Sequence, residues 1–419
     1  MLLALVALNR DDLYIITSAR TSEFDLRSGE MRKVFDNNLE HFSVDELDNK
    51  EISDLIAFMD NYALWGSRQV LSSEKKMQFI RTDCSRELRS VILETLDSPN
   101  IRERIQHILS FDHDPQDRIK STILTSQLLN LAQIRPDLSI LSELLGFDAR
   151  KSVLEHESKL RDFSLIQNGR ITIRSSIFAE YLLKKLIDTA FVIDVMFRCM
   201  IRLDSIFSSD ELYRDIYKNF SRFRFVEFAI AVEKRRVHMI RYFENLKELS
   251  HCRENSLFWL QYAMCRLSLQ QYPEAARLFD VAFAFSKKHG YRENRHLNNQ
   301  YARFLLESRT NSNEYTDYMA AFNKAHSICV KQMHDEPQAQ NPYRQAALYY
   351  EFIDRRVAQL ASGDLLSIFR SCGEVSTFVA KRRSNKTISD APIVEECGKA
   401  MQRATARIRA KLATEGVHV

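Results

Sequence analysis

The chain has 419 residues, of which 45% are hydrophobic and 28% charged, so about two to four domains with a sizeable core are expected. It contains only 9 glycines and 7 prolines, which disfavours a β-sandwich or a Gly-rich enzyme loop system and favours long helices. The net charge of +4 is spread over many Lys and Arg residues and gives no strong case for nucleic acid or a membrane surface.

The first residues, MLLALVALN, are too few to span a bilayer and lack the basic start of a signal peptide. No later stretch reaches the roughly 18 uncharged apolar residues of a membrane helix. The 7 cysteines are scattered, odd in number and form no CxxC pair, so neither a disulfide framework nor a structural zinc site is expected. We expect a cytoplasmic protein that does not span a membrane.

The N-terminal segment combines a helix-like start with LYIITSAR, which is typical of a buried strand that ends at a charged edge. Helical periodicity then begins in FSVDELDNKEISDLIAFMDNY, where Ser43 or Asp45 would cap the helix. SSEKKMQFIRTDCSRELRSVILETLDSPN predicts one further helix that ends before Pro99. RIKSTILTSQLLNLAQI and LSILSELLG predict two more, the second closed by Gly146.

Residues 151–189 predict a helix, a short hairpin around Asn168 and Gly169, and another helix. Helix, hairpin and helix in this order are the outline of a winged-helix unit, although a small α+β packing element fits the same pattern. Only Arg170 and Arg174 are obvious phosphate partners on the hairpin, so contact with DNA is the less favoured interpretation.

The chain after residue 190 is predicted to be all helical and to contain repeats. WLQYAMCRLSLQQYPEAARLFDVAFAF and NNQYARFLLESRTNSNEYTDYMAAFNKAHSI share a Gln-Tyr-Ala motif, at 261–263 and 300–302, and both end in Phe-x-x-Ala. The first fits the tetratricopeptide pattern, in which small residues let two helices approach and aromatic residues fill the space between repeats. A repeat of this length predicts an α-solenoid. The expected packing residues are Trp259, Tyr262, Ala263, Ala275, Phe279, Ala282, Tyr301, Ala302, Phe322 and Ala325.

YRQAALYYEFIDRRVAQL predicts a third, degenerate repeat. From Ala380 onward, a basic and polar stretch, AKRRSNKT, is followed by the predicted helix VEECGKAMQRATARIRAKLA and a short tail.

No motif for an isolated enzyme is present in the sequence. There is no P-loop, G-x-G-x-x-G, G-x-S-x-G, H-E-x-x-H or kinase H-R-D set. FDHDPQD, with Asp112, His113, Asp114 and Asp117, is better explained as a solvated loop of helix caps than as a metal site. We therefore predict no catalytic residues and no metal.

The densest basic run inside a predicted helix is EKRRVHMIRYF. A solvated helix face is the simpler interpretation, and a patch for an acidic partner or nucleic acid is the functional one. Its basic residues are Lys234, Arg235, Arg236 and Arg241.

Several segments together resemble P-loop NTPases of the STAND class from bacteria. LYIITSAR is similar to a late strand of the nucleotide domain, HFSVDELDNKEISDLIAFM and CSRELRSVILETLDSP to the helical lid, and GRITIRSSIFAEYLLKKL to the winged helix. WLQYAMCRLSLQQYPEAARLFDVAFAF resembles the helical repeats that follow. The resemblance covers most of residues 13–330 in the order of that class. It implies that Thr17 and Arg20 are nucleotide-sensing residues, and that Arg20 senses the terminal phosphate.

The chain departs from the STAND pattern in two ways. Both Walker motifs, which would lie upstream of LYIITSAR, are absent, and the winged-helix His that holds nucleoside diphosphate in that class is replaced in Arg174-Ser175-Ser176. Arg20 alone cannot hold a nucleotide against the entropic cost of binding. A split gene with the Walker half on a partner chain, an internal start and a degenerate remnant used only for binding remain three alternatives.

We expect a mainly α protein with a helical lid and a winged-helix unit, followed by an α-solenoid of tetratricopeptide-like hairpins. The expected function is the regulatory and protein-interaction portion of a STAND-type signalling NTPase, in bacterial antiviral defence, whose solenoid senses a protein trigger. The alternatives are a nucleotide-independent repeat scaffold and a STAND-type transcription regulator. The chain is expected to hold no cofactor and to turn over no ATP on its own, since ATP would require a Walker-containing partner chain. Nucleic acid and membranes are not expected partners.

The expected parts are residues 1–30 as the edge of a nucleotide domain, 31–115 as the lid, 116–190 as the winged helix, 191–379 as the repeats and 380–419 as a basic linker with a C-terminal helix.

Overall fold

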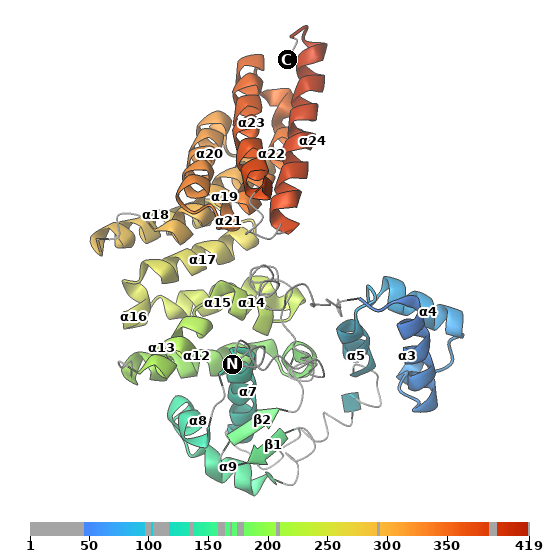
Figure 1. The fold of residues 1–419 in the computed structure, drawn as a ribbon. Helices are drawn as coiled ribbons and strands as arrows, with labels where there is room; N and C mark the ends of the chain where they lie inside the picture. Colours follow the sequence, from blue (N-terminus) through green and yellow to red (C-terminus); the bar gives the residue numbers. More distant parts are fainter. Residues whose placement is uncertain are drawn as a thin grey trace, which may run out of the picture. The chain divides into compact units, whose positions relative to one another are not determined.

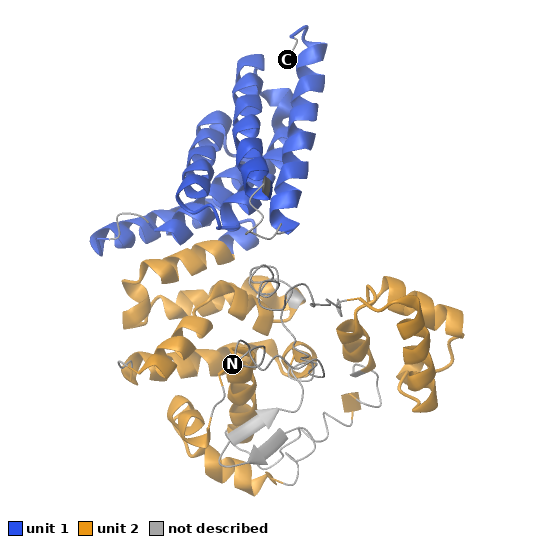
Figure 2. Cartoon of the chain, viewed as in Figure 1, with its two compact units in different colours: residues 1–41, 266–419 blue, residues 42–265 orange. Residues whose placement is uncertain are grey.

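The computed structural model describes residues 46–96, 102–103, 117–134, 137–157, 164–167, 170–173, 180–206, 210–290, 294–384 and 392–417. This part of the chain is mainly helical, as the sequence predicts, and its helices pack in a helical-repeat-like arrangement (Figure 1). The chain divides into two compact units, with the boundary between Cys265 and Arg266, inside one helix (Figure 2). Each unit is therefore described by itself.

The first helices of the N-terminal unit form a small core of their own. Asp48 caps the first helix: its carboxylate accepts from the backbone N–H of Glu51, and the Glu51 side chain accepts from the N–H of Asp48. This reciprocal capping box starts the helix later than the predicted caps Ser43 and Asp45, which lie outside the described residues. The core consists of Ile52, Ile56, Met59, Trp65, Phe79, Ile80, Cys84 and Val91. The elements are α3 (Asn49–Asn61), η1 (Gly66–Arg68), α4 (Ser73–Thr82) and α5 (Leu88–Leu96).

The single helix predicted for residues 72–100 is wrong, because the chain turns between α4 and α5. Ser85 and Arg86 have φ angles of 49° and 62°, in the left-handed region that an α-helix does not use. The backbone N–H of Arg86 then donates to the carbonyl of Ile80, which closes the turn.

Three helices and a β-hairpin follow in this unit. Asp137 and Asp148 cap the second and third helices, and Gly146, with φ of 73°, ends the second as predicted. The strands pair antiparallel, with Gln167 opposite Arg170, so the predicted hairpin is present, while its turn residues 168–169 lie outside the described part. The three helices contact one another, and β2 contacts α7 (Figure 1). The elements are α7 (Arg118–Leu131), α8 (Leu138–Leu145), α9 (Ala149–Glu155), β1 (Ser164–Gln167) and β2 (Arg170–Ile173).

Helix α12 is central among the remaining helices of the N-terminal unit and contacts α7, α8, α13 and α15, while α14 packs on α13 and α15. A turn of π-helix, η2, precedes α12. The elements are η2 (Leu182–Leu186), α12 (Thr189–Ile206), α13 (Glu211–Phe220), α14 (Phe223–Ala229), η3 (Val232–Lys234), α15 (Arg235–Leu246), α16 (Ser250–Arg253) and α17 (Ser256–Ser268), the last of which runs across the unit boundary.

The C-terminal unit consists of helical hairpins. α19 packs on α20 and α23 on α24, and α24 also packs against α21 and α22. The third predicted repeat is two short helices, α21 and α22, and the predicted C-terminal helix is α24. The elements are α18 (Tyr272–Lys288), α19 (Arg295–Asn311), α20 (Tyr318–Asp335), α21 (Asn341–Ala347), α22 (Tyr349–Arg356), η4 (Val357–Gln359), α23 (Ser362–Ser384) and α24 (Pro392–Thr414).

A buried arginine joins two of these hairpins. The guanidinium of Arg356, at the end of α22, donates to the backbone carbonyls of Arg309 (2.6 Å), Thr310 (3.3 Å) and Ser312 (2.7 Å). It also lies over the ring of Tyr318, 4.8 Å from its centroid. Arg356 therefore satisfies carbonyls at the C-terminal end of α19 that no intrahelical N–H can reach.

Within the described ranges, none of the helices is both long and apolar enough to cross a membrane.

Candidate functional site

The two predicted nucleotide-sensing residues, Thr17 and Arg20, lie outside the described residues, as does the whole expected segment 1–30. The described residues with candidate functional roles lie in the repeat helices, in the basic run and in two polar clusters.

Most of the residues predicted for repeat packing lie in the interiors of their units. Tyr262 stacks on Phe243 with ring centroids 5.4 Å apart and planes 8° from parallel. Trp259 is only partly buried, and its indole N–H donates to the carbonyl of Arg253 at 2.8 Å. Tyr301 is also partly exposed. The other predicted residues are buried: Tyr262, Ala263, Ala275, Phe279, Ala282, Ala302, Phe322 and Ala325.

Aromatic residues connect the helices of the C-terminal unit. The ring of Phe279 on α18 lies 5.5 Å from Tyr301 and 5.3 Å from Phe304, both on α19. The ring of Phe322 on α20 lies 4.7 Å from that of Tyr349 on α22. These contacts are the inter-helix packing for which large residues at repeat spacing are suited.

A groove of about 430 Å³ lies over α18, α19 and α20. Its volume is within the range of ligand pockets, and both aromatic and charged residues line it. We call it the α19–α20 groove. Its lining residues are Phe283, Arg295, Asn298, Tyr301, Lys324, Ser327, Ile328, Lys331, Gln332, Asp335 and Glu336.

The polar groups at one end of the α19–α20 groove already have partners. Arg295 forms an ion pair with Glu336, and Gln332 donates to the backbone carbonyl of Arg295 at 3.0 Å. Asp335 lies 3.2 Å from the Nδ1 atom of its neighbour His334. These contacts close the end of the groove at the C-terminus of α20.

At the other end of the α19–α20 groove, around Lys324, the polar side chains have no partners among the described residues. Lys324 is exposed and forms no ion pair with any described carboxylate. The side chain of Ser327, three residues further along α20, likewise has no hydrogen-bond partner among the described residues, and neither has that of Asn298, one turn from Arg295 on α19. Their donors and acceptors therefore remain available to a ligand.

The basic run does not form a continuous unpaired patch. The Lys234 ammonium lies 3.1 Å from a carboxylate oxygen of Asp188, and the Arg241 guanidinium lies 3.1 Å from one of Asp194. Arg236 is exposed, and Arg235 is partly buried. The carboxylates beside α15 therefore offset part of the positive charge that would attract nucleic acid.

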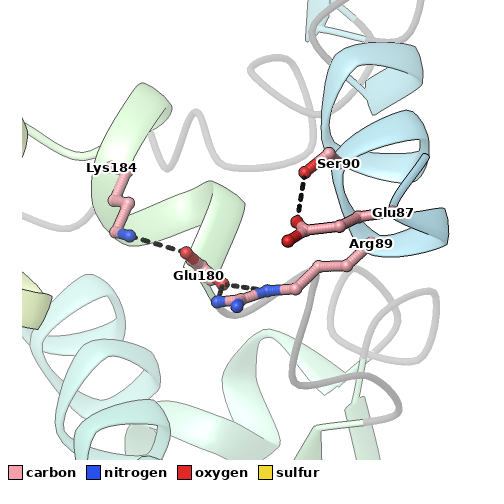
Figure 3. Close-up of polar contacts among 5 residues, drawn as sticks. All are labelled: Glu87, Arg89, Ser90, Glu180 and Lys184. Carbon is pink, nitrogen blue, oxygen red and sulfur yellow. Dashed lines mark hydrogen bonds and ion pairs between the residues drawn. The ribbon is translucent and has the colours of Figure 1, made fainter. Parts of the chain in front are cut away.

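A buried ion cluster joins α5 to the segment that leads into η2 (Figure 3). The carboxylate of Glu180, which is 5% exposed, accepts from the ammonium of Lys184 at 2.6 Å and from Nε of Arg89 at 3.1 Å. Leu93 of α5 packs beside it on Tyr181 and Leu182. We call Arg89, Glu180 and Lys184 the Glu180 cluster.

Lys184 and Arg89 determine the protonation state of Glu180. Burial by itself raises the pKa of this carboxyl group, but the hydrogen bonds and charges of Lys184 and Arg89 outweigh burial, so the pKa lies below its usual value. Lys184 also lies 4.5 Å from the ring centroid of Phe228 on α14. Glu180 is therefore ionised at neutral pH and links α5 to the body of its unit.

The seven cysteines are all buried and are free thiols. Burial raises the pKa of Cys329, Cys372 and Cys397 to about 12, so these thiols are poor nucleophiles. Among the described residues, no cluster of His, Cys, Asp or Glu side chains has the arrangement of a metal site.

The sequence did not indicate the Glu180 cluster, because Arg89 and Glu180 are 91 positions apart. One signal was present: Glu180 interrupts the apolar run IFAEYLL, on a helix that a core would cover. Likewise, the α19–α20 groove combines residues from three helices that repeat spacing alone does not bring together.

Comparison with known proteins gives no relative: no family model, no curated protein and no solved structure matches the chain.

Proposed function

We propose that this chain is the regulatory and protein-interaction portion of a STAND-type signalling NTPase that acts in the cytoplasm in bacterial antiviral defence. The α19–α20 groove, with open polar groups on a helical-repeat array, is the observation that carries the proposal. Helical arrays use such surfaces to bind proteins. In this proposal the array senses a protein trigger.

The N-terminal unit supplies the parts of a switch. α9 and the β1–β2 hairpin follow one another as the first two parts of the helix, hairpin and helix outline of a winged-helix unit, and α7 and α8 precede them. Residues 46–96, the main described part of the proposed lid (31–115), have their own core. The Glu180 cluster joins this lid to the proposed winged helix through Arg89. A small module attached by few contacts is suited to a two-state rearrangement.

The proposal assigns no independent ATPase activity to the chain. The sequence contains no Walker motif, so the phosphate-binding loop and its lysine would come from a separate partner chain. The test is a pull-down with the tagged full chain from native cells, followed by mass spectrometry. Recovery of a chain with G-x-x-x-x-G-K-[ST] is expected, and ATP hydrolysis by the purified chain alone would contradict the proposal.

A nucleotide-independent repeat scaffold is the second candidate, and it is favoured by the absence of a Walker motif from the sequence. The two candidates differ in their response to ATP once the partner is present. A nucleotide at 100 times its Kd stabilises a protein by about 2.7 kcal/mol, which thermal unfolding of the complex detects. A scaffold would show no shift.

A STAND-type transcription regulator is a third candidate, because α9 exposes Arg150 and Lys151 next to the hairpin. It predicts a mobility shift of duplex DNA that weakens as salt rises. Absence of any shift at low salt removes this candidate.

A further inference from the structure

We propose that the α19–α20 groove binds a short acidic segment of a partner protein, with a carboxylate held by Lys324 and Ser327 and an apolar side chain packed beside Phe283. The inference rests on the proposed function, in that it names the partner chemistry of the same repeat array.

The charges that line the groove differ between its two ends. Near the C-terminal end of α20, Arg295 pairs with Glu336, and both Asp335 and Lys331 line the groove, so this end carries both signs of charge. No described carboxylate offsets the charge of Lys324, so an acidic ligand would be attracted towards it.

Two groups at the open end can bind one carboxylate. Lys324 and Ser327 lie three residues apart on α20, and therefore on one face of that helix. A lysine and a hydroxyl donor on one face can form charge-assisted hydrogen bonds to a carboxylate. Asn298 lines the groove from α19, one turn from Arg295, and can donate to another polar group of the bound segment.

Aromatic rings flank these groups. Phe283 and Tyr301 meet edge to face, with centroids 5.2 Å apart and planes 86° from parallel, and both are only partly buried. Burial raises the pKa of Tyr301, so its phenol stays protonated at neutral pH and can donate to a ligand. Ile328 adds apolar surface to the lining.

The same features argue against a nucleic acid. A phosphate backbone needs several unpaired cations along its path, whereas this groove presents Asp335 and the already paired Arg295 at one end. A protein segment with one or two carboxylates next to an apolar residue matches the groove better.

The test uses the full chain and a library of random heptapeptides displayed on phage. Selection on the wild-type chain should enrich Asp or Glu next to an aromatic or aliphatic residue. Synthetic peptides from the enriched pool are then measured by fluorescence anisotropy. Lys324→Glu should weaken binding at least tenfold, and Lys324→Arg should retain it within about threefold, because the cation remains.

Arg277→Glu is the matched control. Arg277 is exposed on α18 and does not line the groove, so reversing its charge should change the affinity by less than about twofold. Circular dichroism of each variant checks that the helices are intact.

Enrichment of basic peptides, no enrichment above background, or equal affinity for Lys324→Glu would each overturn the inference. These outcomes are distinct from a failure of the proposed function. If the native pull-down recovers a Walker-containing chain equally with wild type and Lys324→Glu, the function stands and only the acidic ligand is lost.

Discussion

Replacing Arg89 by Ala is predicted to loosen α5 while the rest of its unit stays folded. The side chain of Arg89 is 52% exposed, whereas that of Glu180 is 6% exposed and keeps Lys184 as its partner when Arg89 is removed. Loss of a half-exposed ion pair costs about 0.5–1 kcal/mol, since water screens it. Arg89→Ala should therefore raise the equilibrium constant for local opening of α5 by about two- to fivefold.

Replacing Glu180 by Ala should lower the free energy of unfolding more than Arg89→Ala does. Glu180→Ala removes the shared acceptor of two charge-assisted hydrogen bonds, and each is worth about 1.5–3 kcal/mol before the freed cations are hydrated. Both cations reach water, since their side chains are 52% and 25% exposed. We therefore expect a net loss of about 2 kcal/mol, larger than for Arg89→Ala.

The stability that the Glu180 cluster contributes is expected to decrease as the pH falls. The folded-state pKa of Glu180 lies below the ordinary value of 4.5, so the cluster contributes its full stability above about pH 4.5. That contribution is lost as the pH falls through the folded-state pKa, because the protonated carboxyl no longer attracts Arg89 or Lys184. The difference between wild type and Arg89→Ala should disappear in the same range.

Hydrogen exchange followed by mass spectrometry is the assay. Amides of α5 should exchange about two- to fivefold faster in Arg89→Ala, and those of α12 should be unchanged. Arg81→Ala on α4 is a control, since Arg81 is exposed and its guanidinium contacts only the side-chain oxygen of Asn49 at 2.9 Å among the bonds described. Equal exchange of α5 in wild type and Arg89→Ala, or a larger effect of Arg89→Ala than of Glu180→Ala, would show that the ion pair of Arg89 with Glu180 does not hold α5.

Three further predictions concern stability and reactivity. Arg356→Ala should lower the unfolding free energy by about 3–5 kcal/mol, because several carbonyls of the α19 terminus lose their donor, while the exposed neighbour in Arg355→Ala should cost under about 0.5 kcal/mol in thermal or denaturant unfolding. Phe279→Ala should cost about 3–5 kcal/mol, since Phe279 is fully buried, and a loss as small as that of the partly exposed Phe283→Ala would contradict the packing. The seven buried thiols should resist N-ethylmaleimide in the native chain and react in denaturant; rapid modification of the native chain, read by intact mass, would show that the thiols are accessible.

Repeat spacing was the most informative part of the sequence. Small residues such as Ala275 and Ala302, and large ones such as Phe279 and Phe322, are spaced as repeat packing requires, and all four are buried. The pattern is readable because each repeat buries the same face of its helices, so the constraint recurs along the chain.

Local geometry without a marker residue was not predictable. The turn between α4 and α5 uses Ser85 and Arg86 at positive φ, where a glycine would have been the usual signal. The capping residue Asp48 was missed because Ser43 and Asp45 offered the same chemistry three to five positions earlier. Long-range contacts such as that of Arg89 with Glu180 depend on the tertiary fold and leave no periodic trace in the sequence.

The Arg356 contact has a mechanical consequence for the repeat array. The guanidinium of Arg356 on α22 donates to three backbone carbonyls at the end of α19. Any movement of that end of α19 relative to α22 would therefore break several hydrogen bonds at once. The opposite end of α19, where Arg295 begins the helix, has no such clamp from α22 and borders the groove. The two ends of α19 are therefore held by different helices, the C-terminal end by α22 through Arg356 and the N-terminal end by α20 through the Arg295–Glu336 ion pair, and a ligand in the groove meets only the second of these attachments.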